Sequence, residues 1–266
     1  MTAIDQTLLD SVEQIARDAG RAIMEIYGRE FSVEEKEDKS PLTEADAAAH
    51  KLIVSRLQEL APDLPILSEE DTAAFAGPDG DGRYWLVDPL DGTKEFIKRN
   101  GEFTVNIALI ENDTAVLGVV YAPVLDVAYL GLKGAGAFKV DAEGRHPIRV
   151  AEHADGETWR VVGSRSHAGA ETAAWLEKLG EHEMVSMGSS LKLCLVAEGA
   201  ADVYPRLGPT SLWDTAAAQA VVEQAGGSVI QLDGEPLSYA NTAQILNPYF
   251  IVHGNSAQDW SSFSAG

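Results

Sequence analysis

The segment Asp88-Pro-Leu-Asp91-Gly-Thr93 places two carboxylates three residues apart with no basic residue between them. Pro89 pre-sets its own backbone for a tight turn and keeps Asp88 extended. Two carboxylates this close repel each other unless a cation neutralises them, and Mg²⁺ suits such a pair together with a substrate phosphate. Gly92 lets a phosphate approach backbone N–H groups that form an anion-binding concavity. The segment therefore predicts a metal and phosphate site, ahead of an ordinary Asp-Gly turn.

Two further acidic segments can complete such a site. Ser68-Glu69-Glu70-Asp71 follows a short apolar segment, and Asp214 opens a helical segment rich in Ala and Val. Taken singly, these acids are typical of a solvated strand end and of a helix N-terminus. Together with Asp88 and Asp91, Glu69 and Asp214 supply the four carboxylates of a phosphatase in which two ions clamp the attacking and leaving oxygens.

These blocks, in this order, resemble the inositol monophosphatase superfamily of Mg²⁺-dependent, lithium-sensitive phosphatases, and the resemblance covers nearly the whole chain. Within that superfamily, Lys94-Glu95-Phe96 is similar to the 3'(2'),5'-bisphosphate nucleotidases, since inositol phosphatases usually carry Asn before the Phe. Leu207 and Leu212 stand near Asp214, where inositol phosphatases have an acid that binds sugar hydroxyls. Three more segments point to the nucleotidases: Gly163-Ser-Arg-Ser-His167, Gly188-Ser-Ser-Leu-Lys192 and Tyr204-Pro-Arg-Leu-Gly-Pro-Thr-Ser211.

The resemblance implies a fold of mixed α+β and α/β character, a layered αβαβα sandwich. It implies hydrolysis of the 3'-phosphate of adenosine 3',5'-bisphosphate (PAP) to AMP in sulfur assimilation, with the sulfated form (PAPS) as a further substrate. Two or three Mg²⁺ ions per site are expected, with Ca²⁺ or Li⁺ inhibitory. The alternatives are an inositol monophosphatase or sugar (bis)phosphatase of the same superfamily and, less favoured, a non-enzymatic acidic Ca²⁺-binding protein, which lacks support because no EF-hand loop is present.

With this resemblance, roles can be assigned to single residues. Direct in-line attack by a metal-activated water is expected, with Thr93 and Asp46 orienting that water; Asp46 also fits a capping box begun by Thr43. Asp88 would bridge two ions. Glu69 is expected to be a catalytic residue as well as a metal ligand, and it can also reach a third ion through a water molecule. The expected metal ligands are Glu69, Asp88, the carbonyl of Leu90, Asp91 and Asp214.

The second half of the chain is expected to bind the nucleotide. Lys192 and Arg206 suit the phosphate that is not cleaved, Arg206 through its bidentate fork, although each could also be an ordinary surface charge. His167, one of six histidines, could equally be unremarkable. The expected substrate-binding residues are Glu69, Leu90, Asp91, Gly92, Thr93, Ser164, Ser166, His167, Ser189, Lys192, Arg206 and Asp214.

The charge of the chain restricts its partners. The formal net charge is −22, from 20 basic and 42 acidic residues. A nucleic-acid polymer or an anionic lipid surface needs a basic footprint, which is not expected here. A small phosphate ester would also be repelled unless bound cations invert the local sign. We therefore expect a small-molecule nucleotide substrate, and a monomer or a homodimer.

Compartment signals are consistent with the cytoplasm. The single cysteine, Cys194, cannot form an intrachain disulfide and lies in an apolar helical run, where a buried thiol is expected. No basic-then-apolar signal peptide opens the chain. The most apolar stretch, Thr114 to Leu132, contains Pro123 and Asp126 and predicts two strands joined by a turn, not a membrane helix. The resemblance to family members described as peripheral at the inner membrane leaves such an attachment open for this chain as well.

Hydrophobic periodicity predicts elements in two halves, 1–147 and 148–266. An amphipathic helix is expected from Ile4 to Tyr27, closed by Gly28, and a second helix from Thr43 to about Leu60. A strand from Tyr84 to Val87 would deliver Asp88 at its end. Further strands crowd together up to Val140, after which strands alternate with helices in a second, α/β half.

Overall fold

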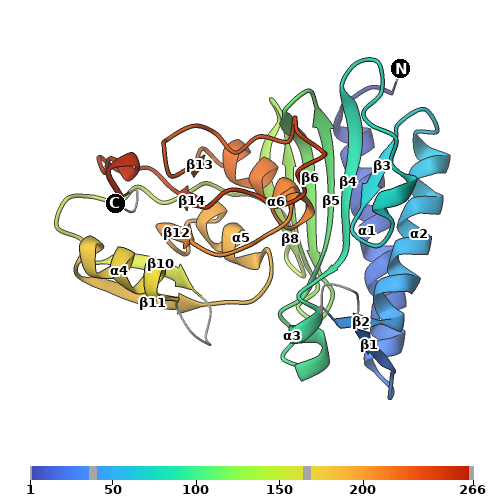
Figure 1. Cartoon of the computed structure of the whole chain (residues 1–266), viewed down its shortest axis with the longest axis horizontal. Helices are drawn as coiled ribbons and strands as arrows, with labels where there is room; N and C mark the ends of the chain where they lie inside the picture. The colour runs from blue at the N-terminus through green and yellow to red at the C-terminus, as the bar shows by residue number, and fades with distance from the viewer. Residues whose placement is uncertain (1, 36–40, 164–168, 264–266) are drawn as a thin grey trace.

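The computed structural model describes residues 2–35, 41–163 and 169–263, which form five layers alternating between helix and sheet (Figure 1). Helices α1 and α2 lie on one side of a seven-stranded sheet, α5 and α6 lie between this sheet and a five-stranded one, and α4 lies beyond the second sheet. This arrangement confirms the expected αβαβα sandwich. The helices are α1 (Gln6–Tyr27), α2 (Glu44–Leu60), α3 (Thr93–Lys98), α4 (Ala170–Leu179), α5 (Leu191–Ala197) and α6 (Leu212–Gln224).

The seven-stranded sheet follows the chain order from β3 to β9. Strand β3 is parallel to β4, and every later neighbour pair is antiparallel. The apolar stretch Thr114 to Leu132 is thus two strands joined by a turn, as expected. The strands are β3 (Ile66–Ser68), β4 (Arg83–Asp91), β5 (Thr104–Glu111), β6 (Thr114–Ala122), β7 (Val127–Leu132), β8 (Gly136–Asp141) and β9 (Gly144–Pro147).

Strand β4 is longer than predicted. It does not end at Val87 but continues to Asp91, with a shift in its register against β5 between Asp88 and Asp91. Pro89 explains both features, because it keeps the preceding residue extended yet has no N–H to donate to the ladder. The two aspartates therefore sit on an irregular strand end that pairing with β5 holds in place.

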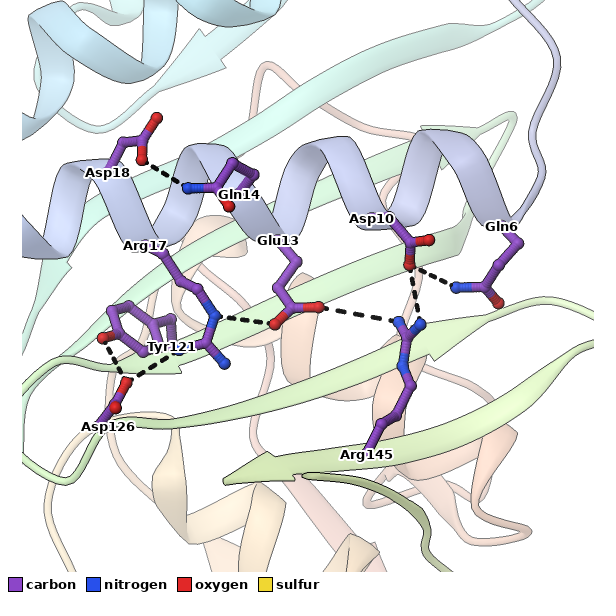
Figure 2. Close-up of polar contacts among 9 residues, drawn as sticks. All are labelled: Gln6, Asp10, Glu13, Gln14, Arg17, Asp18, Tyr121, Asp126 and Arg145. Carbon is purple, nitrogen blue, oxygen red and sulfur yellow. Dashed lines mark hydrogen bonds and ion pairs between the residues drawn. The ribbon is translucent and has the colours of Figure 1, made fainter. Parts of the chain in front are cut away.

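Helices α1 and α2 end where the sequence predicts, and they begin one or two residues later than predicted, at Gln6 and Glu44. The Asp5 side chain caps α1, which closes at Gly28, and Thr43 with Asp46 forms the expected capping box of α2. Charged side chains also connect α1 to the turn between β6 and β7 and to the edge strand β9 (Figure 2): Arg17 pairs with Asp126 at 2.9 Å and Asp10 pairs with Arg145 at 2.8 Å. Partly exposed ion pairs of this kind stabilise the folded protein by about 0.2–1 kcal/mol each, so apolar packing contributes most of the free energy that holds α1 on the sheet.

Besides its apolar side-chain contacts, helix α6 lies directly against the backbone of the seven-stranded sheet at two glycines. A Cβ atom at Gly118 of β6 would come within 2.1 Å of the Ala217 carbonyl oxygen, and one at Gly131 of β7 within 2.5 Å of the Ala220 carbonyl oxygen. Real side-chain atoms do not approach so closely, so only glycine fits at these two positions. The helix is thereby seated directly against the middle of the seven-stranded sheet.

The five-stranded sheet has the order β11-β10-β12-β14-β13. Strands β10, β11 and β12 run parallel, whereas β14 is antiparallel to both of its neighbours. Trp175 of α4 and Trp260 of the 3₁₀ helix η2 (Trp260–Phe263) cover its far face. The strands are β10 (Trp159–Gly163), β11 (His182–Ser186), β12 (Val203–Arg206), β13 (Ser228–Gln231) and β14 (Phe250–His253).

The first sheet ends at Pro147, next to the predicted division of the chain into 1–147 and 148–266, which stays a prediction. The largest apolar cluster joins residues from both sides of that division, among them Ala108 and Ala217. Cys194 is buried, as expected. No helix within residues 2–35, 41–163 and 169–263 is both long and apolar enough to cross a membrane.

The sequence did not predict several of the short elements. These are β1 (Val33–Glu35), β2 (Pro41–Thr43), the 3₁₀ helix η1 (Thr72–Ala74), α3, β9 and η2. They are too short to show a periodic apolar pattern. Helix α3 matters for the site, because it begins directly after the Asp-Gly pair.

Candidate metal and phosphate site

Three of the predicted metal ligands come together across the two halves of the chain. One carboxylate oxygen from each of Asp88, Asp91 and Asp214 lies within 4.8 Å of the others. Asp88 and Asp91 come from the end of β4. Asp214 comes from the first turn of α6, which begins at Leu212 and not at Asp214 as the sequence suggested. Its side chain accepts the Ser211 N–H at 2.8 Å, so the same carboxylate caps the helix and joins the cluster.

The three carboxylates are in an environment that disfavours their charge. Burial, and then the carboxylates of Glu69, Asp91 and Asp214, raise the pKa of Asp88 well above its ordinary value. Burial and Asp91 raise the pKa of Asp214 to about 8. Burial raises the pKa of Asp91 to about 6, against the opposing effects of Lys192 and the Ser190 N–H. A buried set of oxygen donors that cannot all ionise without a cation fits a hard divalent metal ion.

We therefore expect the metal-free protein to lose stability as the pH rises. The raised pKa values mean that the folded state binds more protons than the unfolded chain between the ordinary Asp pKa of about 4 and the value of about 8 at Asp214. The free energy of unfolding, measured with urea and a chelator, should fall across this window. A divalent metal ion should restore it most at the alkaline end, because it binds the ionised carboxylates.

The matched control is Asp214→Asn, which removes one of these titrating groups and should flatten the pH dependence of the chelated protein. Other acids of this highly charged chain are the same in both proteins. Equal slopes for the variant and the parent would show that the carboxylate cluster does not cause the pH dependence.

Glu69 reaches the cluster through β3. Its backbone N–H donates to the carbonyl oxygen of Val87 at 3.1 Å, which places Glu69 beside the residue that precedes Asp88. Its carboxylate contributes to the raised pKa of Asp88. The sequence did not predict a further contact here: the His50 Nδ1 of α2 lies 2.9 Å from the Ser68 Oγ, directly before Glu69.

Asp46 both caps helix α2 and contacts Thr93, the two arrangements that the sequence left open. Its Oδ2 accepts the Thr43 N–H at 2.8 Å and the Thr43 hydroxyl at 2.6 Å, which makes the cap. Its Oδ1 accepts the Thr93 hydroxyl at 3.3 Å. A capping carboxylate has two oxygens, so it can cap α2 with one and hold Thr93 with the other.

The residues between Asp88 and Thr93 fold back on the first carboxylate. The Leu90 N–H donates to the Asp88 Oδ1 at 3.0 Å, and the Leu90 carbonyl oxygen lies 3.4 Å from the Thr93 Oγ1. Gly92 has φ of 91°, a left-handed conformation that favours glycine, and it is the N-cap of α3. The first N–H groups of α3 are therefore free of intrahelical partners beside the cluster.

Two cations from the second half approach the acids. Lys192 lowers the pKa of Asp91, and Arg206 lowers that of Asp214, although burial outweighs both effects. Arg206 donates to the Pro209 carbonyl oxygen at 2.8 Å, while its buried Nε has no hydrogen-bond partner among the described residues. Ser189 lies near Gly92, since a Cβ at that glycine would be 3.3 Å from the Ser189 Cβ. Ser164, Ser166 and His167 fall outside the described residues.

Arg206 also lines a cavity of about 280 Å³ at the carboxyl ends of β10 and β12. Most of its other lining is apolar or glycine. It includes Gly163, Met184, Tyr204 and Leu207. No local pattern in the sequence indicates this cavity, because its walls come from four separate segments.

Comparison with known proteins agrees with this geometry. The family model described as "Inositol monophosphatase family" matches residues 5–260. The chain belongs to the inositol monophosphatase family. Among its relatives within the family, the 3'(2'),5'-bisphosphate nucleotidase CysQ of Escherichia coli K12 is 53% identical over 247 residues, which are 92% of this chain and 99% of that protein.

Solved structures of the inositol monophosphatase family have the same fold. The crystal structure of CysQ from Bacteroides thetaiotaomicron superposes with a TM-score of 0.82 at 43% identity, covering 94% of this chain and 98% of that one. The inositol monophosphatase of Anabaena (Nostoc) sp. PCC 7120 superposes with a TM-score of 0.77 at 26% identity, covering 97% and 94%. This family member is a phosphatase, as predicted.

Proposed function

We propose that this phosphatase is an Mg²⁺-dependent 3'(2'),5'-bisphosphate nucleotidase that converts PAP to AMP and also accepts PAPS, in sulfur assimilation. The observation that carries the proposal is the pair Lys192 and Arg206, which places two cations beside the carboxylate cluster of a strongly acidic chain. The nucleotidase relatives, at 53% and 43% identity, are also more similar to the chain than the inositol monophosphatase at 26%.

The residues proposed to bind the metal ions are Asp88 and the oxygen donors around it. Mg²⁺ suits this set, because carboxylates and a backbone carbonyl are hard ligands. When bound, the ions lower the pKa of water and neutralise charge on the phosphoryl oxygens. The proposed ligands are Glu69, Asp88, the Leu90 carbonyl oxygen, Asp91 and Asp214.

Thr93 and Asp46 are proposed to orient the attacking water. The Thr93 hydroxyl donates to Asp46, so its oxygen lone pairs are left to accept a hydrogen bond from the water and orient it. The buried Asp46 is itself fixed by two bonds from Thr43, which limits its movement. The N–H groups of Gly92 and Thr93 would hold oxygens of the scissile phosphate.

Lys192 and Arg206 are proposed to bind the second phosphate of the substrate. The scissile phosphate is met by the metal ions, whereas the other phosphate needs fixed cations of the protein. Arg206 has a buried Nε without a partner among the described residues, so a phosphate oxygen would satisfy it. The neighbouring cavity, largely apolar, offers space for the nucleoside.

Replacement of either cation tests this proposal. Lys192→Ala and Arg206→Ala should each lower kcat/KM for PAP by about 1.5–3 kcal/mol, the value of a hydrogen bond to a charged group. Neither change should much affect a minimal substrate with one phosphate, since it has no second anion to lose. Phosphate release from PAP, inositol 1-phosphate and the minimal substrate is measured side by side with Mg²⁺ and with a chelator.

Lys133→Ala is the matched control, because it removes the same charge from an exposed position directly after β7, near Glu223 at the opposite end of α6 from Asp214. Equal losses on PAP and on the minimal substrate would mean that Lys192 and Arg206 serve the scissile phosphate or the fold. A higher kcat/KM for inositol 1-phosphate than for PAP would favour the alternative, an inositol or sugar phosphate hydrolase.

The compartment we propose is the cytoplasm, since the buried thiol of Cys194 suits a reducing environment. A monomer or a homodimer remains the expected assembly. No feature of the described residues supports the peripheral attachment to the inner membrane.

A further inference from the structure

Two N–H donors converge on one oxygen of Asp91. The Ser190 backbone N–H lies 2.6 Å from the Asp91 Oδ2, and the Asn106 Nδ2 lies 3.5 Å from the same atom. Both donors thus form hydrogen bonds with Oδ2 of Asp91, so Oδ1 is the oxygen that can bind a metal ion. A carboxylate with one oxygen fixed by the protein can present the other in a single orientation.

Behind these donors lies a buried chain of three side chains. The Ser190 Oγ donates to the Asn106 Oδ1 at 2.8 Å, and the Thr104 Oγ1 is 2.8 Å from the Ser190 Oγ. Since the single hydroxyl hydrogen of Ser190 goes to Asn106, Thr104 must be the donor to Ser190. All three residues are at most 1% exposed, and low dielectric strengthens such fully paired networks.

The turn that carries Ser190 fits closely against α3 and the segment that follows it. A Cβ at Gly188 would lie 2.9 Å from both the Glu102 carbonyl oxygen and the Glu95 Cγ. Ser189 has φ of 47°, a left-handed conformation that costs a non-glycine residue free energy. The hydrogen bonds of Ser190 therefore hold a strained turn in place, and α5, with Lys192, begins directly after it.

We infer that Asn106 and Ser190 are positioning residues of the metal site, which orient Asp91 and lock the α5 turn onto it. Neither residue touches the substrate or the reacting atoms in this role. The inference goes beyond the proposed function and rests on it only for the identity of the ion as Mg²⁺. It also means that the sheet residue Asn106 sets the position of a metal ligand and, through the turn, of a nucleotide-binding cation.

Mg²⁺ binding to the purified full-length protein, measured by calorimetry without substrate, tests this inference. Asn106→Ala should raise the Kd for Mg²⁺ by about 10–100-fold, the usual effect of removing a residue that orients a metal ligand. In kinetics, the Mg²⁺ concentration needed for half-maximal turnover should rise, and kcat should recover at saturating Mg²⁺. A purely structural role would not give this recovery.

The matched control is Tyr129→Phe. It removes the hydrogen bond of 3.1 Å from β7 to Glu198, at the opposite end of α5 from Ser190. We expect a lower free energy of unfolding with an unchanged Kd for Mg²⁺. An Asn106→Ala protein that matches Tyr129→Phe in both measurements would overturn the inference.

Two further variants keep the test open if Asn106→Ala does not fold. Thr104→Val removes only a hydroxyl and keeps the shape, and Ser190→Ala removes the central link of the chain. Each should weaken Mg²⁺ binding, and their double variant should be far from additive, because the residues act in one chain. Parent-like Kd values in both would overturn the inference. Failure of the parent protein itself to bind Mg²⁺ would instead contradict the proposed function.

Discussion

Replacement of Asp88 by Asn should abolish Mg²⁺-dependent phosphate release while the protein remains folded. Asp88 is buried at the centre of the cluster, where Glu69, Asp91 and Asp214 all affect its pKa. The amide keeps the shape of the side chain but removes the charge that two ions would share. Bound metal ions contribute several kcal/mol to phosphoryl transfer, and a loss of about 4 kcal/mol corresponds to about 10³-fold in rate.

Stability separates this effect from misfolding. Because Asp88→Asn relieves repulsion among buried carboxylates, the chelated variant should unfold with a free energy at least equal to that of the chelated parent. Adding Mg²⁺ should then stabilise the parent much more than the variant. Near-normal Mg²⁺-dependent turnover by Asp88→Asn would show that this carboxylate does not bridge the ions.

Thr93→Ala and Asp46→Asn should lower kcat by about 10²–10⁴-fold, the range for loss of a positioned proton acceptor, with a smaller change in KM. Orienting the water acts mainly in the transition state, so the substrate complex is less affected. Since Asp46 holds Thr93 through a hydrogen bond of 3.3 Å, the double variant should be little worse than either single one. Steady-state kinetics with PAP at saturating Mg²⁺ give all three comparisons.

Thr43→Ala is the control that isolates helix capping. It removes the hydroxyl that shares Asp46 with Thr93 and should cost about 1 kcal/mol of stability. Most of kcat should remain, because the bond from Thr93 to the other Asp46 oxygen is kept. If Thr43→Ala lowers kcat as much as Asp46→Asn does, or if the losses at Asp46 and Thr93 simply add, then Asp46 serves only as a helix cap.

The sequence predicted those parts of the molecule that local pattern determines. The apolar period of α1, the capping box of α2 and the turn within Thr114 to Leu132 depend on near neighbours, and all three were predicted correctly. The acids of the metal cluster were found because Asp88-Pro-Leu-Asp91 is a dense local motif. Asp214 was added only because a two-metal site needs further carboxylates, since nothing local distinguishes it from a helix cap.

Contacts between distant segments could not be predicted in this way. Asn106 and Ser190 are 84 residues apart, and their hydrogen bond depends on how a turn of the second half docks on β5. One local signal was available: Asn106 is the polar residue within the otherwise apolar run 105–110 of β5, and a buried polar group needs a partner. The extension of β4 past Pro89 was missed for a similar reason, because pairing with β5 continues beyond the proline.

The close packing of α6 on the seven-stranded sheet limits how the enzyme can be redesigned. Gly118 and Gly131 face each other in neighbouring strands, so at these two positions the backbone of α6 lies directly against the sheet, with no side chain between them that could repack. This backbone contact fixes the distance between α6 and the sheet. It therefore also fixes the position of Asp214 relative to the aspartates of β4. New substrate preferences can be built by altering the loops around Arg206 or the outer helix α4, whereas even one added carbon beneath α6 would separate the third carboxylate from the other two.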